Sequence, residues 1–168
     1  MAGRKKIQHQ GREVDVTEIP FETRGEHWNE YLVDDGSVIK LKTVTGEILR
    51  IDGEYDAEGN PLYLVKSTNI VTVSAPEKLR EVRGRRLKTR YGDQSVDAIE
   101  IPFQTGGEFW SEYELKDGSA IKLKTVTTET LRIEGQKDPE GNPIYIVKSR
   151  NIVTISAPES LRRPAGGG

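Results

Sequence analysis

The chain contains the same set of sequence motifs twice, at a constant offset of 82 residues. Ile19-Pro20-Phe21 recurs at 101–103, and Ser74-Ala75-Pro76-Glu77 recurs at 156–159. Between positions 14 and 80 the two copies align without insertion or deletion, and about two-thirds of the paired positions are identical. A duplication on this scale sets the architecture before any other feature does. It predicts two tandem copies of one small module.

Each copy has the pattern of an all-β module. Apolar and polar residues alternate on both sides of Asp35-Gly36 and Asp117-Gly118, which is a hairpin signal. The strand after each turn runs on for many residues, and its phase shifts near Val44 and Val126, which indicates a β-bulge. Pro20 and Pro102 should end an opening strand in each copy. We therefore expect a duplicated small barrel or sandwich with about five strands per copy.

Charge divides the chain into bodies and connectors. Positions 13–77 hold 14 acidic and 5 basic residues, and positions 91–161 hold 12 acidic and 7 basic residues. The compensating cations lie in the connectors, outside the acidic bodies. The expected organisation is a basic arm (1–13), a first module (14–80), a basic linker (81–95), a second module (96–162) and a Gly-rich tail (163–168).

Composition excludes several classes of protein. There is no cysteine, which removes disulfides, thiolate metal sites and cysteine nucleophiles. The basic N-terminus has no apolar segment behind it, and no apolar run approaches the ~18 residues of a membrane span. A cytoplasmic or virion-associated protein is the expectation. With 34% hydrophobic residues, below the usual ~45%, each thin module should gain stability from a neighbour.

No residue pattern points to catalysis. His27 is replaced by Phe109 in the second copy, so the module does not require an imidazole there. Nucleotide-binding, Walker and zinc-protease motifs are absent from the sequence. The Asp56-x-Glu58-Gly-Asn60 segment could offer oxygen ligands to calcium, but a plain hairpin turn fits it better. We expect a non-enzymatic protein without cofactor, metal or small-molecule substrate.

The two tryptophans are the candidate anchors of an interface. Trp28 and Trp110 recur at the repeat offset, and period two places Trp110 on the outer face of its strand with Phe109 inside. An outward tryptophan among glutamates is typical of a protein–protein contact. The alternative is a ring folded over the barrel mouth. The predicted interface comprises Trp28, Trp110, Tyr31 and Tyr113.

The linker is the most basic part of the chain. Three interpretations stay open for it: a solvated connector, a strap on an acidic module of its own or another chain, or a contact to nucleic acid. Acidic bodies on either side disfavour an extended nucleic-acid track. The cations concerned are Arg80, Arg83, Arg85, Arg86, Lys88 and Arg90.

The C-terminus ends in Arg162-Arg163-Pro164-Ala165 followed by three glycines. This end resembles the Gly-Gly tail of ubiquitin-like modifiers, which also occur as tandem modules. The resemblance implies a substantial helix across the sheet, and the sequence indicates none. The alternative is a plain terminal tail.

These observations favour a structural or interaction protein over an enzyme. The prediction is self-association, or assembly into a larger complex such as a filament, shell or virion, through acidic modules, basic straps and exposed tryptophans. Nucleic-acid binding through the linker is the alternative, and a tandem ubiquitin-like modifier is a minor one. No membrane partner is expected.

Overall fold

The computed structural model describes residues 3–163, and the fold is almost entirely β. The all-β prediction is confirmed, with six strands per copy rather than about five. The first copy contains β1 (Arg4–His9), β2 (Arg12–Glu18), β3 (Phe21–Gly25), β4 (Trp28–Val33), β5 (Val38–Tyr55) and β6 (Pro61–Ser74). The second contains β7 (Arg85–Tyr91), β8 (Gln94–Glu100), β9 (Phe103–Gly107), β10 (Ser111–Leu115), β11 (Ala120–Lys137) and β12 (Pro143–Ser156). One 3-10 turn, η1 (Glu159–Leu161), follows.

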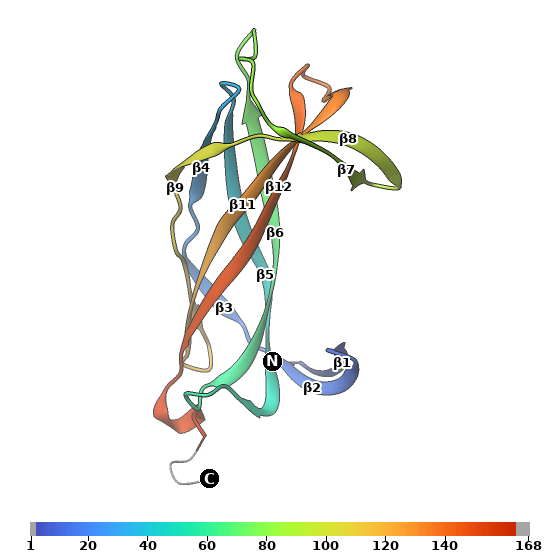
Figure 1. Ribbon diagram of the computed structural model, residues 1–168. Coiled ribbons are helices and arrows are strands. Elements are labelled where there is room, and N and C mark those ends of the chain that lie inside the picture. Colours follow the sequence, from blue (N-terminus) through green and yellow to red (C-terminus); the bar gives the residue numbers. More distant parts are fainter. Residues whose placement is uncertain (1–2, 164–168) are drawn as a thin grey trace.

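The two copies exchange strands. The first sheet has the order β1-β2-β5-β4-β9, with β6 on the other side of β5, so it ends on a strand of the second copy. The second sheet has the order β3-β10-β11-β8-β7, with β12 beside β11, and it takes β3 from the first copy. Figure 1 shows the resulting elongated body, with the long strands running along its length. Neither sheet is complete without the other copy.

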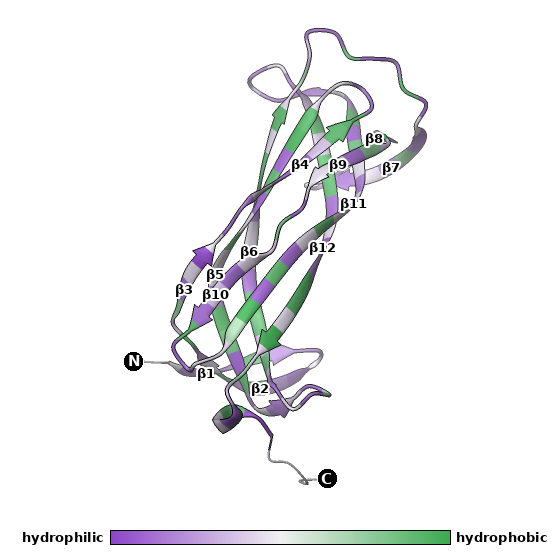
Figure 2. Ribbon diagram, turned by 90° about the vertical axis from the view of Figure 1, so that its left-hand side faces the viewer, coloured by the Kyte–Doolittle hydropathy of each residue, from purple (hydrophilic) through white to green (hydrophobic). Residues whose placement is uncertain are grey.

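A single antiparallel ribbon makes the exchange. Residues 21–33 run against residues 103–115, with Val33 opposite Phe103 at one end and Phe21 opposite Leu115 at the other. Phe21 and Phe103 are equivalent positions of the two copies, and so are Val33 and Leu115. Interchanging the copies therefore turns one pair into the other. The copies are thus related by an approximate two-fold axis through the middle of this crossover ribbon. Figure 2 shows the ribbon strands β3, β10, β4 and β9 crossing the face turned to the viewer.

The hydrophobic core is shared in the same way. One cluster combines Ile48 of the first copy with Tyr113 and Ile121 of the second, and another combines Ile39 with Ile101. The long strands allow this because β5 is 18 residues long and contributes to both clusters. A third cluster, Val14, Val16, Leu49 and Ile51, lies within the first copy. Burial of the other two clusters against the second copy supplies the neighbour that the thin composition requires.

The predicted bulge and turn are present. The β5–β6 register shifts between Thr45 and Glu47, and the β11–β12 register shifts between Thr127 and Glu129. An extra residue at this point bends the strand and lets its two halves face different clusters. Pro20 lies between β2 and β3, as the sequence indicated. Gly36, in the tight turn after Asp35, has φ 97°, a backbone conformation that glycine adopts without strain.

The basic connectors are folded, which corrects their interpretation as a linker outside the repeat. Residues 85–100 form the β7–β8 hairpin, and residues 4–18 form the β1–β2 hairpin. Arg4 pairs with Thr17 and Arg86 pairs with Ile99, which is the same register at the offset of 82. The duplication therefore extends through both connectors. In Figure 1 the two hairpins project from the two ends of the body on the same side.

The C-terminal tail lies partly outside the described residues. Arg163 is described, and 164–168 of the Gly-rich tail are not. Within residues 3–163, no helix crosses a sheet as the ubiquitin-like resemblance implied, because the only helical element is η1 with three residues. No helix in this described part has the length and hydropathy needed to cross a bilayer.

Strand exchange predicts that the halves hold together after the connecting chain is cut. A protease site inserted between Glu81 and Arg83 should yield two fragments that co-elute on gel filtration and separate only in denaturant, because two of the hydrophobic clusters combine the copies. An uncut sample is the control. Fragments that part under native conditions and each keep a β circular-dichroism spectrum would contradict the exchange.

Candidate interaction surface

The centre of the crossover ribbon brings the most unusual residues of both copies together. The flanking register pairs are Gly25 with Glu112 and Glu30 with Gly107. Between them lie residues 26–29 and 108–111, four from each copy, next to the approximate two-fold axis. Strand pairing is interrupted here, so side chains leave the simple alternation of a β-strand. Two glutamates turn inward, and the residues after them turn outward.

The inward glutamates, Glu26 and Glu108, hold the copies together. The Glu26 carboxylate accepts hydrogen bonds from the Tyr113 hydroxyl (2.8 Å) and the Thr45 amide (2.8 Å). Glu108 repeats the arrangement with the Tyr31 hydroxyl (2.7 Å) and the Thr127 amide (2.9 Å). Burial and the bond to the glutamate together raise the pKa of each tyrosine to about 12. Both phenols therefore stay protonated and act as donors at neutral pH.

These glutamates were missed in the sequence. The available signal was that Glu26 and Glu108 are identical in both copies while the next residue changes from histidine to phenylalanine. A residue that is the same in both copies, next to one that differs, indicates that its side chain has a required contact. It does not reveal that the contact is with a tyrosine of the other copy.

Polar groups also meet on the axis itself. The Thr43 and Thr125 hydroxyls lie 2.6 Å apart, and each bonds the amide oxygen of its cross-strand asparagine, Asn69 or Asn151 (2.8 Å). The buried Asn29 side chain donates to the Thr125 carbonyl (3.0 Å) and accepts from a ribbon amide. A wholly apolar contact could slide, whereas these bonds fix the register of one copy against the other.

The outward residues form an exposed aromatic patch. We define the aromatic patch as His27, Trp28, Phe109 and Trp110. Trp28 is 41% exposed, Phe109 51% and Trp110 37%, and the His27 and Phe109 rings pack edge to face with centroids 6.1 Å apart. Lys42 and Lys124 place their ammonium groups 5.9 and 5.7 Å from the centroids of the two indoles. Each ammonium group is attracted to the face of its indole and favours the observed orientation of the ring.

Three aromatic residues lie differently from the sequence prediction. Phe109, expected inside, is exposed because it lies between β9 and β10, where period-two alternation does not apply. Tyr31 and Tyr113, expected at an interface with the tryptophans, are 0% and 1% exposed. They contact the other copy within the chain, and neither ring is available to an outside partner.

The predicted basic strap contacts acidic groups of its own chain. Arg85 pairs with Glu100 (3.0 Å), Arg86 with Glu134 (3.2 Å), and Lys88 with Asp97 (3.8 Å). The Arg80 amide donates to the Asp35 carbonyl (2.8 Å). Arg83 and Arg90 are exposed, and Arg83 lines a shallow depression beside β4. Ion pairs within the chain reduce the positive charge that the strap presents to phosphates.

Two buried clusters, here called clasps, fasten the ends of the molecule. In the first, Asp35 accepts hydrogen bonds from Tyr145 and from Arg132 (2.9 Å), both of the second copy, and from the Ser37 amide (2.9 Å). In the second, Asp117 accepts from Tyr63 (2.6 Å) and Arg50 (3.1 Å) of the first copy. Each Asp-Gly turn thus inserts its carboxylate into the other copy.

The Asp35 carboxylate is stabilised in its charged form. Burial alone would raise the pKa of Asp35, but the hydrogen bonds from Tyr145, Ser37 and Arg132 outweigh burial and lower the pKa from its usual value. Burial also raises the pKa of Tyr145 and Tyr63, with the carboxylate of each clasp adding to the effect. Each clasp therefore keeps a charged acceptor and protonated donors.

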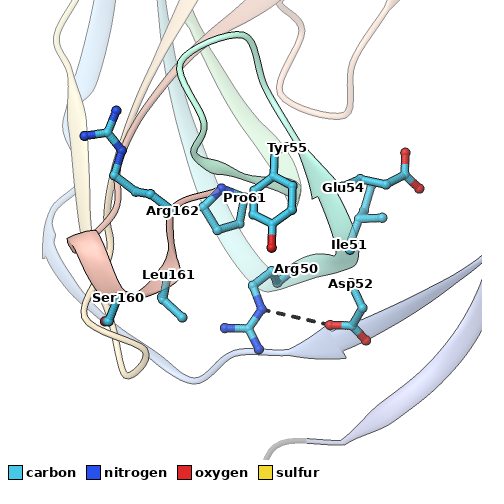
Figure 3. A pocket seen from close by; sticks show the side chains of 10 residues that line it. Arg50, Ile51, Asp52, Glu54, Tyr55, Pro61, Ser160, Leu161 and Arg162 are labelled. Atoms are coloured by element: carbon cyan, nitrogen blue, oxygen red, sulfur yellow. Dashed lines mark ion pairs between the residues drawn. The ribbon is translucent and has the colours of Figure 1, made fainter. Parts of the chain in front are cut away.

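A cavity lies between β5 and the C-terminal segment. Figure 3 shows this cavity of about 360 Å³, lined by Arg50, Asp52, Tyr55 and the C-terminal segment at Leu161, with an Arg50–Asp52 ion pair of 4.0 Å. No histidine lines it. Among residues 3–163, no group of three His, Asp or Glu side chains is arranged to hold a metal ion. The Asp56 carboxylate bonds the Glu58 and Asn60 amides (2.9 Å each), as a turn requires.

Comparison with known proteins gives no relative: no family model, curated protein or solved structure matches this chain.

Replacing a clasp carboxylate should destabilise the fold. Asp35→Ala leaves Arg132 and Tyr145 without their buried acceptor, and we expect a loss of about 3 kcal/mol in the free energy of unfolding, measured by urea denaturation. The effect should be present above pH of about 4 and fade as the pH falls through the lowered pKa of Asp35. Asp34→Ala, at an exposed neighbour, is the control. Equal stability of the two variants would refute the clasp.

The buried tyrosines should make the fold sensitive to alkali. Unfolded phenols ionise near pH 10, whereas Tyr31 and Tyr113 remain protonated up to a pKa of about 12. Their raised pKa values stabilise the fold below pH 10, and this contribution is lost as the pH rises through 12. The melting temperature of Tyr31→Phe/Tyr113→Phe should fall less steeply between pH 9 and 11.5 than that of the wild type. Parallel pH profiles would disprove this account.

Proposed function

We propose that the protein is a non-enzymatic structural protein that associates with itself through the aromatic patch. The observation that carries this proposal is the exposure of Trp28, Phe109 and Trp110, which lie in two segments that meet at the centre of the crossover ribbon, where the His27 and Phe109 rings pack together. Large aromatic side chains gathered on a surface are the residues that anchor protein interfaces. Cation–π contacts favour one orientation of each indole before binding, which reduces the side-chain entropy lost on association.

The position of the patch supports a second copy of this chain as the partner. Both copies of the repeat contribute to the patch, and it lies on the approximate two-fold axis between them. A surface with its own two-fold symmetry can meet an identical surface so that every contact is made twice. A pair of molecules joined this way is a unit from which a filament, a shell or a virion component is built.

The basic straps have a supporting role in this proposal. The ion pairs of Arg85, Arg86 and Lys88 show which chemistry the strap favours, namely carboxylates on a β surface. Similar contacts to the acidic body of a neighbouring molecule would add to the aromatic contact. They would be screened by salt, whereas burial of the indoles would not.

Removing both indoles should weaken self-association. For Trp28→Ala/Trp110→Ala we expect a dissociation constant at least about tenfold higher in sedimentation velocity, since an anchoring tryptophan contributes roughly 1–2 kcal/mol or more. The circular-dichroism spectrum should not change, because both rings are on the surface. Tyr91→Ala, which removes an exposed aromatic ring from the β7 hairpin, is the control and should associate normally.

Two results would count against the proposal. A wild-type protein that stays monomeric at every concentration and salt would eliminate self-association. Salt-dependent retention of the wild type on single- or double-stranded nucleic acid, lost when Arg83 and Arg90 are replaced by alanine, would favour the nucleic-acid alternative instead.

A further inference from the structure

The strand β6 has one free edge along its length. It pairs only with β5, and the backbone hydrogen bonds outside the sheets of residues 3–163 include none from residues 61–74. Residues 68–72 are all exposed. On the inner face, the Asn69 side chain accepts from the Thr43 hydroxyl and reaches Ser149 of β12 (3.5 Å), and no backbone group of another strand pairs with the outer edge of β6 in the described residues. An uncovered edge presents a row of backbone N–H and C=O groups that can pair with another strand.

The middle of β6 lacks the usual protection of an edge strand. The segment Thr68–Val73 contains no charge, no proline and no glycine, and five of its six residues are β-branched. Ile70 is 46% exposed and Val71 is 40% exposed. Natural edge strands are commonly protected by lysine, proline, a bulge or a covering loop. An uncharged β-branched segment of six residues is instead a segment that pairs readily.

The equivalent strand of the second copy is protected. On β12, Ile152 and Val153 are exposed to a similar degree, but Arg150 stands at the position of Thr68. The end of β12 is also covered, since the Asn60 side chain bonds the Ile155 carbonyl (3.4 Å) and the Ala157 amide (3.3 Å). No corresponding bond from Asn142 to β6 is present among residues 3–163. The two edges have the same shape and differ in charge and cover.

We propose that β6 pairs edge to edge, antiparallel, with β6 of a second copy of this chain. When a two-fold axis relates the two molecules, residues 68–73 of one lie opposite residues 68–73 of the other. Because this segment is uncharged, no like charges meet. Pairing of β6 with β12 of another molecule would bring in Arg150, and the other hairpin edges, β1 and β7, carry several cations. The β6 segment is therefore its own best complement.

This contact rests on the proposed self-assembly and is separate from the aromatic patch. Figures 1 and 2 agree that β6 lies on the side of the body away from the crossover ribbon. A molecule with two different two-fold contacts on opposite sides binds one neighbour through each of them. Repeating both contacts gives an open chain of molecules in which the two kinds of contact alternate. Each contact alone gives a dimer.

The test uses full-length protein in sedimentation velocity over a range of concentrations. The wild type should form a concentration-dependent series beyond the dimer. Thr68→Arg, which gives β6 the charge of β12, should stop at the dimer made by the aromatic patch. Trp28→Ala/Trp110→Ala should stop at the β6 dimer, and combining the three substitutions should give a monomer. Ser160→Arg adds the same charge outside any strand and should behave as the wild type.

A gain-of-association variant makes the inference sharper. Arg150→Thr, in the Trp28→Ala/Trp110→Ala background, gives β12 the uncharged segment of β6 and should extend the β6 dimer into a longer series. Hydrogen exchange should slow for the amides of residues 68–73 on association. Thr68→Arg that associates like the wild type would overturn the β6 contact and leave the patch standing. If the tryptophan variant associates like the wild type while Thr68→Arg is a monomer, the patch fails and the β6 contact stands.

Discussion

The antiparallel pairing of residues 21–33 with residues 103–115 is the contact on which the rest of the structure depends. It commits β3 and β4, which follow each other in the chain, to different sheets, and it does the same to β9 and β10. Two hydrophobic clusters then contain residues of both copies. The protein is thereby an interlocked pair of repeats, in which the two clusters beside the ribbon need both copies and a further cluster at Val14, Val16, Leu49 and Ile51 belongs to the first copy alone. The covalent connection keeps the two copies at high effective concentration.

Carboxylates that bind the opposite copy define the geometry around this ribbon. Glu26 and Glu108 bind the tyrosines of the opposite copy near the axis, and Asp35 and Asp117 bind tyrosine and arginine of the opposite copy at the ends. Buried charge is a weak source of stability but a strong source of specificity when every bond is satisfied. Some of the acidic residues therefore bind the other copy of the repeat instead of contributing charge to the surface. Fewer acidic groups are left to attract the basic straps than the net charge suggests.

The sequence predicted the strands, the Asp-Gly turns, the bulge and the outward tryptophans because each depends on local alternation. It could not predict strand exchange, since a β-strand has the same pattern whichever copy supplies its neighbour. The same ambiguity hid the partners of Tyr31 and Tyr113. Phe109 was misplaced because residues 108–110, between β9 and β10, break the period of two. The β7 hairpin was missed because the many charged residues from Arg85 to Arg90 hide the alternation of a strand. Only alignment with the β1 hairpin shows that both hairpins have the same register.

The threonine pair on the axis limits how alike the two repeats can be. Thr43 and Thr125 make three contacts between them, one to each other and one to each asparagine, yet two hydroxyls carry only two protons. If both threonines donate outward, their oxygens face each other at 2.6 Å without a proton between them. One threonine must donate to the other, and its own asparagine must then turn its amide to become the donor. The two identical threonines therefore point their hydroxyl protons in different directions, so the hydrogen bonds at the centre do not follow the two-fold symmetry of the duplicated sequence.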